Sequence, residues 1–328
     1  MYKRILLSVL VIIVLVAGCS TKQEDGQVKY ENTFRMAETH PSNHPTTIAD
    51  NEFVRRVEEE TEGRIKIILY PNKELGEESE VIDQVGFGAI DFTRVSIAPL
   101  SEIVEEMKVL LLPYLYEDGD HMWRVLNGEI GDYFLDKVKE KGYVGLGWFD
   151  AGVRSFYTID KPIKTLDDLK GLNIRVMESS LMLDMIEALG ANGIMLSYGQ
   201  VYSSLQTGAI DGAENNFASF VTASHLEVAK YYSVDEHVRI PEIIIASEKT
   251  FAKISLEDQE IIKRVAKEIT EYQKELWEKR DLELKQVILD AGVEINYIED
   301  KSEFIKAVEP IYEDYPEFKE LIEKIKNQ

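Results

Sequence analysis

The sequence predicts an α/β protein with two lobes, each a mostly parallel sheet flanked by helices. Its 328 residues are more than one ordinary hydrophobic core organises. Apolar runs of strand length alternate with amphipathic helical segments through residues 30–96 and again through 165–216, which is the pattern of parallel sheets covered by helices. The order helix, Gly-Ala-Ile-Asp, strand occurs twice, at 88–91 and 208–211. This repetition suggests two similar lobes.

The composition is that of a globular and strongly acidic protein. Hydrophobic residues make up 45% of the chain and charged residues 30%. There are 60 acidic and 37 basic residues, which gives a net charge of −23. A surface of this sign repels nucleic acid and anionic lipid, so we expect neither as a partner. It also repels an anionic ligand at long range, and an anion site therefore requires a local, shielded cluster of arginines.

The first 30 residues predict a signal peptide, residues 1–18, followed by a lipidated tether, residues 19–30. A basic start precedes the apolar run 5–16, which is too short to span a bilayer. The sequence Val-Ala-Gly-Cys, ending at Cys19, resembles the lipobox of bacterial lipoproteins. It implies cleavage before Cys19 and a lipid anchor on its thiol at the outer side of the membrane. The alternative is a plain signal peptide with an incidental cysteine. Cys19 is the only cysteine, so we expect no disulfide.

Residues 31–151 are predicted to build the first lobe, together with a return segment at about 240–280. Strand-like and helix-like apolar patterns alternate here, and Gly or Pro ends several of them. The expected strands are 30–37, 65–70, 92–96 and 143–149, and the expected helices are 46–62, 79–87, 99–109 and 122–141. Residues 110–115 are apolar but contain a proline, so we expect a buried turn or a short strand there.

Residues 152–239 and about 281–328 are predicted to build the second lobe. The expected strands are 172–176, 191–196 and 293–298, and the expected helical segments are 165–170, 180–189, 199–206 and 301–328. The β-rich run 240–247 leads back to the first lobe. A helix that begins after Ser255 continues to Ala291, a length of roughly 54 Å. It is longer than one lobe, and we therefore expect it to lie across both.

Polar groups gather where the predicted strands end. Arg154 and Arg175 lie near the ends of apolar runs, the cluster Glu-Asn-Asn at 214–216 follows the second Gly-Ala-Ile-Asp, and Arg94 and Ser96 follow the first. In α/β sheets ligands bind beyond the carboxyl ends of the strands, so two facing lobes bring both sets to one cleft. Because a guanidinium forms two parallel hydrogen bonds with a carboxylate, we expect the arginines to hold a small organic acid.

Other interpretations of these residues stay open. Each arginine can instead form a salt bridge inside one lobe, as most semi-buried arginines do. Tyr198 can belong to the core, and Asp150 can be a turn residue. His40 and His44 have the spacing of a helical metal pair, but two neighbouring prolines make a helix improbable. We expect a loop in which either histidine can donate a hydrogen bond to a ligand, and no metal site.

Six motifs, in order over nearly all of the mature chain, resemble the solute-binding proteins of TRAP transporters, the DctP type. They are LYPNKELGEE at 69–78, Gly-Ala-Ile-Asp with its strand at 88–96, LPYLY at 112–116, AGVRSFY at 151–157, DLKGLNIRV at 168–176 and YGQVYSSLQTGAIDGAEN at 198–215. The resemblance implies a two-lobed fold like that of periplasmic binding proteins, with a long helix spanning both lobes. It also implies capture of a small carboxylate and its delivery to a small and a large integral membrane subunit, without catalysis and without a cofactor.

The motifs also carry roles to particular residues. Arg175 corresponds to the arginine that pairs with the ligand carboxylate, Arg154 to a second carboxylate-contacting arginine, and Asn215 to a ligand-contacting asparagine. Further positions that fall where the family lines its pocket are Ser96, Glu178, Tyr198 and one of Glu77 and Glu78. The chain departs from the family at Asn216, which stands in place of a proline, and at 191–196, which lacks the usual prolines. Both departures bear on the shape of the pocket.

The polar side chains around the expected cleft are more numerous than a plain dicarboxylate requires. They are Arg94, Ser96, Asp150, Glu178, Asn215 and Asn216. The runs GWFDAGVRSFY and DGAENN resemble the uronate-binding branch of the family, which implies a hexuronate such as glucuronate or galacturonate. The alternatives are a C4-dicarboxylate, sialic acid or another sugar acid, an extracellular enzyme acting on uronates, or the partner of a sensor. No Gly-x-Ser-x-Gly elbow or cysteine nucleophile supports the enzyme.

Overall fold

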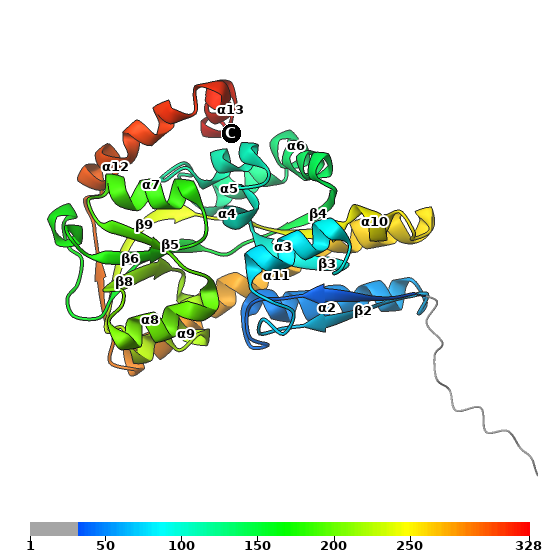
Figure 1. Ribbon diagram of the computed structural model, residues 1–328, viewed down its shortest axis with the longest axis horizontal. Helices are drawn as coiled ribbons and strands as arrows, with labels where there is room; N and C mark the ends of the chain where they lie inside the picture. Colours follow the sequence, from blue (N-terminus) through cyan, green and yellow to red (C-terminus); the bar gives the residue numbers. More distant parts are fainter. Residues whose placement is uncertain (1–31) are drawn as a thin grey trace, which may run out of the picture.

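The computed structural model describes residues 32–328, which form two sheets flanked by helices (Figure 1). The predicted signal peptide, tether and acylated Cys19 lie outside the described residues. The first sheet has the strand order β2-β1-β3-β10-β4, and the second has the order β11-β9-β5-β8-β6-β7. The strands are β1 Asn32–Ala37, β2 Ile65–Tyr70, β3 Phe92–Ser96, β4 Tyr143–Phe149, β5 Val153–Thr158, β6 Asn173–Val176, β7 Asn192–Met195, β8 Gly212–Asn215, β9 Tyr231–Arg239, β10 Glu242–Ser247 and β11 Glu294–Tyr297.

Each sheet is mixed but mostly parallel, as the sequence predicts, because only β10 in the first sheet and β5 in the second run against the other strands. In the first sheet β1 is parallel to β2 and β3, whereas β10 is antiparallel to β3 and β4. In the second sheet β6 is parallel to β7 and β8, and β11 to β9, whereas β5 is antiparallel to β8 and β9. The chain leaves the first sheet through β4 and β5 and returns through β9 and β10. Because these two crossings run in opposite directions, the strands that make them pair antiparallel in both sheets.

The helices cover both sheets, and one of them serves both. They are α2 Pro45–Glu60, α3 Glu78–Phe87, α4 Ile97–Leu100, α5 Gly119–Leu126, α6 Glu129–Lys137, α7 Ser180–Ala188, α8 Val201–Thr207, α9 Phe217–Thr222, α10 Glu248–Phe251, α11 Leu256–Asp290, α12 Ser302–Val308 and α13 Lys319–Lys326. The long helix α11 contacts α2 and β4 on the side of the first sheet and α9 on the side of the second. The expected helix across both lobes is thereby confirmed. Among residues 32–328, no helix combines the length and the apolar character that crossing a membrane requires.

Some elements differ from those that the sequence predicts. The expected helix 122–141 is interrupted at Asn127 and Gly128, where α5 ends and α6 begins. Strands β5 and β9 and helix α9 were not separate predictions. In β9 the charged residues Asp235 and His237 interrupt the apolar pattern, yet both are fully buried, and His237 Nδ1 lies 2.9 Å from Asp235 Oδ2. Because these two charged residues are buried as an ion pair, hydrophobic periodicity alone does not predict this strand.

The C-terminal segment, residues 302–328, contacts elements on the sides of both sheets. Helix α12 packs against α7, which follows β6 of the second sheet. At the other end, the ring of His121 in α5 lies with Nε2 2.7 Å from the carbonyl oxygen of Ile325, and Arg124 Nε donates to the carbonyl oxygen of Gln328 at 3.0 Å. Figure 1 shows this segment, in orange and red, running from α7 to α5. The predicted lobe boundaries assign it to the second lobe alone.

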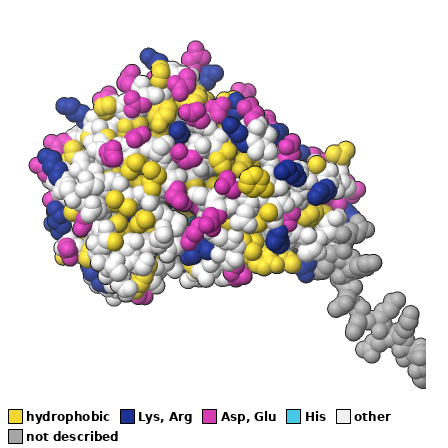
Figure 2. All heavy atoms as spheres, viewed as in Figure 1, with side chains coloured by type: hydrophobic (Ala, Val, Ile, Leu, Met, Phe, Trp, Pro, Cys, Tyr) yellow, Lys and Arg dark blue, Asp and Glu magenta, His cyan; other side chains and the backbone are white. Residues whose placement is uncertain are grey.

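The surface agrees with the acidic composition. Figure 2 shows Asp and Glu side chains over the whole of one face, with fewer Lys and Arg side chains between them. On the face shown, the basic side chains are scattered among the acidic ones and form no patch, in keeping with the net charge of −23. It supports the expectation that anionic polymers are repelled.

Candidate ligand-binding site

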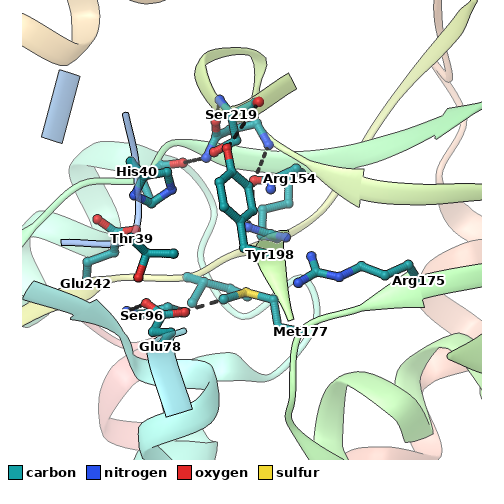
Figure 3. A pocket seen from close by; sticks show the side chains of 14 residues that line it. Thr39, His40, Glu78, Ser96, Arg154, Arg175, Met177, Tyr198, Ser219 and Glu242 are labelled. Atoms are coloured by element: carbon teal, nitrogen blue, oxygen red, sulfur yellow. Dashed lines mark hydrogen bonds between the residues drawn. The ribbon is translucent and has the colours of Figure 1, made fainter. Parts of the chain in front are cut away.

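A small cavity lies between the two sheets. Its walls are Thr39, His40, Glu78, Ser96, Ala151, Arg154, Arg175, Met177, Tyr198, Asn215, Asn216, Ser219, Ile240 and Glu242. These residues come from the ends of strands in both sheets, from the start of α3 and α9, and from the two crossings between the sheets. Polar side chains from both halves of the molecule therefore face one enclosed space (Figure 3).

Arg154, in β5, is almost fully committed to its own lobe. Its guanidinium donates to Glu214 through Nε and Nη2, at 2.5 and 2.9 Å, and Nη2 also donates to the carbonyl oxygen of Glu214 at 2.9 Å. Nη1 donates to Asn215 Oδ1 at 2.8 Å. Burial alone would raise the pKa of Glu214, but Arg154 and His237 hold it at about 2. The salt bridge inside one lobe, which the sequence left as an alternative, is thus present, although Arg154 also lines the cavity.

Arg175, in β6, has the opposite character. Its side chain is 2% exposed, and Nε donates to the carbonyl oxygen of Leu196 at 2.9 Å. Within residues 32–328, Nη1 and Nη2 have no hydrogen-bond partner and the guanidinium has no ion-pair partner. Burial lowers the pKa of Arg175 from its ordinary value. In Figure 3 this side chain reaches alone into the cavity from one side. A buried cation of this kind is costly without an anion, and the cavity is where an anion can reach it.

Arg94 is placed differently from what the sequence predicts. It is fully buried and does not line the cavity. Nε donates to Glu38 Oε2 at 3.0 Å and Nη2 also pairs with Glu38. Nη1 forms an ion pair with Glu242 Oε2 at 2.8 Å, but the angle between the two groups is not that of a hydrogen bond. Asp50 completes the group at 3.6 Å from Nε. Arg94 is therefore the centre of an internal ion-pair network that supports one wall.

Two acids and a serine belong to the wall supplied by the first lobe. Glu78, the first residue of α3, is partly buried, and its Oε1 accepts from the backbone N–H of Ser96 at 2.6 Å. Glu242, the first residue of β10, is 5% exposed. Burial raises the pKa of Glu78 to about 7 and that of Glu242 to about 8, against the attraction of Arg94. Both carboxyls therefore retain much of their proton near neutral pH.

The remaining predicted residues on the wall are two asparagines and a tyrosine. Asn215, at the end of β8, accepts from Arg154 and from the N–H of Asn216 through Oδ1. Its Nδ2 group takes part in neither of these bonds. Asn216 caps α9 by accepting from the N–H of Ser219 at 2.7 Å and donates to the carbonyl oxygen of Ala151 at 2.8 Å. The hydroxyl of Tyr198 donates to the carbonyl oxygen of Ser219 at 3.4 Å. These bonds fix the rim of the cavity on the side of α9.

Four predicted site residues besides Arg94 do not line the cavity. They are Glu77, Glu178, Asp150 and His44. Glu77 and Glu178 instead bridge the two halves, because Glu77 accepts from Gly199 N–H at 3.3 Å and Glu178 from Ser79 Oγ at 2.8 Å. Asp150 accepts from Gly152 N–H at 2.6 Å, as a turn residue does. The ring of His44 stacks on that of His40, with centroids 3.9 Å apart.

Several lining residues were absent from the predicted set. They are Thr39, Ala151, Met177, Ser219, Ile240 and Glu242. His40, which the sequence left open as a hydrogen-bond donor to a ligand, lines the cavity as well. Three of these residues had a detectable signal: Thr39 and His40 follow directly on the end of β1, and Met177 follows β6, so the strand-end rule applies to them as well. Glu242 had none, because it begins a strand whose neighbours become known only with the sheet order. Within residues 32–328 no group of His, Cys, Asp and Glu is placed to hold a metal ion.

Comparison with known proteins identifies the family. Residues 36–318 match the family model described as bacterial extracellular solute-binding protein, family 7, or DctP. The chain is 39% identical over 300 residues to a solute-binding protein of Chromohalobacter salexigens. The matched region covers 90% of this chain and 89% of that protein.

Solved structures agree with this match. A TRAP periplasmic solute-binding protein from Chromohalobacter salexigens, with bound D-glucuronate, superposes with a TM-score of 0.87 at 40% identity, over 90% of this chain and 99% of that one. One from Xanthobacter autotrophicus, with bound β-D-galacturonate, gives 0.87 at 38% identity over the same shares. The cavity between two lobes, the helix spanning both and these matches make the chain a member of the DctP family, the non-enzymatic, extracytoplasmic solute-binding proteins of TRAP transporters.

Proposed function

We propose that this protein captures a hexuronate, such as glucuronate or galacturonate, and delivers it to the small and large membrane subunits of a TRAP transporter. The observation that carries the proposal is the state of Arg175, whose guanidinium is buried in the cavity wall without an acid partner among residues 32–328. The two similar structures with bound hexuronates support the choice of ligand.

The strength of the expected contact follows from its chemistry. A carboxylate accepts two parallel hydrogen bonds from the unpaired edge of a guanidinium. Hydrogen bonds to charged groups contribute about 1.5–3 kcal/mol each, and micromolar binding corresponds to about 8 kcal/mol. Arg175 alone therefore supplies a large part of the affinity. Burial has also removed water from this guanidinium, and a bound carboxylate compensates for the lost hydration.

Arg154 and Asn215 are expected to add weaker contacts. A guanidinium has five N–H groups, and four hydrogen bonds from Arg154 go to Glu214 and Asn215. One N–H on Nη1 is therefore left for a ligand oxygen. The Nδ2 group of Asn215 is a second donor on the same wall. Both groups suit a carboxylate oxygen or a sugar hydroxyl next to Arg175.

Calorimetric titration of the purified protein tests the proposal. We expect D-glucuronate or D-galacturonate to bind, and D-glucose, which lacks the carboxylate, to bind at least 100-fold more weakly. Arg175→Gln should lower the affinity by roughly 10- to 100-fold for each hydrogen bond lost, and Arg175→Lys should recover little of it, because a point charge does not replace the planar fork. Arg280→Lys, at an exposed i,i+3 pair with Glu283, is the control. Unchanged affinity in Arg175→Gln would refute the role.

The same titration distinguishes the other ligand classes. Succinate represents C4-dicarboxylates and N-acetylneuraminate represents sialic acids. If either binds more tightly than both hexuronates, the chain is a binding protein for that acid and the hexuronate assignment is wrong.

We also propose two features that the sequence predicts and the described residues do not reach or test. The first is a lipid anchor on Cys19, expected from the lipobox. Cys19→Ala should release the protein from the membrane fraction and abolish incorporation of labelled palmitate, and unchanged membrane association would contradict it. The second is a division into lobes at 31–151 with about 240–280, and 152–239 with about 281–328, which close on the ligand as hinged domains do.

A further inference from the structure

We propose that the cavity selects acids with a single carboxylate and excludes those with a second carboxylate at the far end of the same carbon chain, such as hexarates. Glu78 and Glu242 are the residues that make this distinction. The inference rests on the proposed function, in that Arg175 receives the carboxylate of the ligand.

The charges in the cavity wall are unevenly distributed. Four of the lining side chains are acids or arginines: Glu78, Arg154, Arg175 and Glu242. Arg175 comes from β6 of the second sheet, whereas Glu242 comes from β10 and Glu78 from α3 beside the first sheet. Figure 3 shows Arg175 entering from one side and Glu242 on the opposite side, with Glu78 on the wall below. A ligand whose carboxylate meets Arg175 therefore points its other end toward the two acids.

No cation in the described part of the chain is available to a second carboxylate at that end. Arg94 is fully buried behind the wall and is shared between Glu38 and Glu242. Arg154 is neutralised by Glu214. The nearby Lys73 lies 5.8 Å from the centre of the Tyr198 ring and is not a lining residue. His40, the remaining basic group, has a pKa lowered from its usual value by burial, so it is neutral near pH 7.

The acidic end suits hydroxyl groups. A sugar hydroxyl donates one hydrogen bond and accepts others, so it can bind a glutamate in either protonation state. A carboxylate only accepts. Beside Glu78 or Glu242 it can be bound only if that acid is protonated, and otherwise two like charges meet in a site with little water. The second carboxylate of a hexarate therefore lacks the hydrogen bond that a hydroxyl group of a monocarboxylate donates to an ionised glutamate.

Matched pairs of acids test the inference by calorimetry at pH 8. D-gluconate and D-glucarate share a six-carbon open chain and differ by one carboxylate, and L-threonate and L-tartrate do so with four carbons. In each pair we expect the monocarboxylate to bind at least tenfold more tightly. In Glu78→Gln, and in Glu242→Gln, the difference should shrink several-fold, because the amide keeps the shape and removes the charge. The control is Glu74→Gln, an exposed acid in the loop before α3, which should leave the difference unchanged.

The outcomes separate this inference from the proposed function. Equal or tighter binding of the dicarboxylate in any pair, by the wild-type protein, overturns the selectivity. Selectivity that persists unchanged in both glutamate variants overturns the role of these residues. Absence of hexuronate binding, with a monocarboxylate still preferred in one pair, refutes the hexuronate and leaves the selectivity standing. If Glu242→Gln fails to fold through its contact with Arg94, Glu78→Gln carries the test, because its amide oxygen keeps the bond to Ser96.

Discussion

The side-chain amide of Gln273, midway along α11, holds Asp150 by both of its backbone groups. Gln273 Oε1 accepts from the N–H of Asp150 at 2.8 Å, and Nε2 donates to its carbonyl oxygen at 2.7 Å. Gly152, two residues on, has φ +65°, and a Cβ at this position would lie 2.8 Å from Trp277 Nε1. The first crossing between the sheets is thereby fixed to the long helix.

Replacing this amide should destabilise the protein. Gln273→Ala leaves a buried N–H and a buried carbonyl unpaired, and each such group costs about 1–3 kcal/mol. We expect urea denaturation to show a loss of about 2–6 kcal/mol in the free energy of unfolding, the sum for the two groups. Gln286→Ala removes an exposed glutamine of the same helix that bonds only to Asp290, and it should change stability by less than about 0.5 kcal/mol. Similar losses in the two variants would contradict the assigned role of Gln273.

The two lining arginines should respond in opposite ways to loss of charge. Arg154→Gln leaves Glu214 buried without its main partner, a change that typically costs about 3–5 kcal/mol. Arg175→Gln removes a buried cation that has no acid partner in the described residues, so the unliganded protein should keep its stability or gain slightly. Thermal melts without ligand compare the two variants. A larger drop for Arg175→Gln than for Arg154→Gln would show that the assignment of structural and ligand-binding arginines is reversed.

A carboxylate of the first lobe is bound at the start of a helix of the second. Glu102 Oε1 accepts from the N–H of Ser180, at 2.8 Å, and from its hydroxyl, at 2.9 Å. These bonds exist only while the lobes are together, so Glu102→Ala should weaken ligand binding about two- to tenfold, the equivalent of one exposed hydrogen-bond pair. Dissociation of ligand, followed by stopped flow, should become faster. Glu105→Ala, a nearby exposed acid, is the control, and an equal effect there would argue against a specific contact.

Affinity for an anionic ligand should fall as pH rises from 6.5 to 8.5. A bound anion raises the pKa values of Glu78 and Glu242 further, so binding takes up protons and is favoured below about pH 7–8. Among the neighbouring groups, Glu38 and Glu214 have lowered pKa values and His40 is neutral. Burial works against the charge of His237, but Asp235 and Glu214 raise its pKa to about 9, so it begins to lose its proton only at the upper end of this range. If the anion shifts the pKa by about one unit, the affinity falls roughly tenfold. Titrations in two buffers of different ionisation enthalpy measure the proton uptake, and its absence would contradict the prediction.

The sequence predicted the regular elements wherever apolar periodicity was unbroken. The strands 65–70, 92–96 and 143–149 have the same bounds in the structure, because β-branched and aromatic residues make up most of each. Prediction failed at β9, where Asp235 and His237 are paired in the core. The local sequence pattern shows two charged residues, but it does not show that they neutralise each other and can therefore be buried.

The same limit applies to the site. Strand ends, motifs and residue chemistry brought Arg154, Arg175 and Asn215 to one cavity, as predicted. They did not distinguish an arginine that is already paired from one that is not, because Glu214 lies 60 residues from Arg154 along the chain. For Arg94 the acids that bind it, Glu38 and Glu242, lie on different strands of the first sheet or just after them. Such partnerships depend on sheet order.

The C-terminal segment connects α7 to α5 in addition to the strands that cross between the sheets. Any swing that parts the two halves must therefore either drag this segment along with one of them or detach it at one end. The carbonyl oxygens of Ile325 and Gln328, with their partners His121 and Arg124, mark the end near α5. A fluorophore joined to the last residue would consequently sit where its surroundings change during the swing, which makes the tail of this chain a natural place for an optical reporter of uptake.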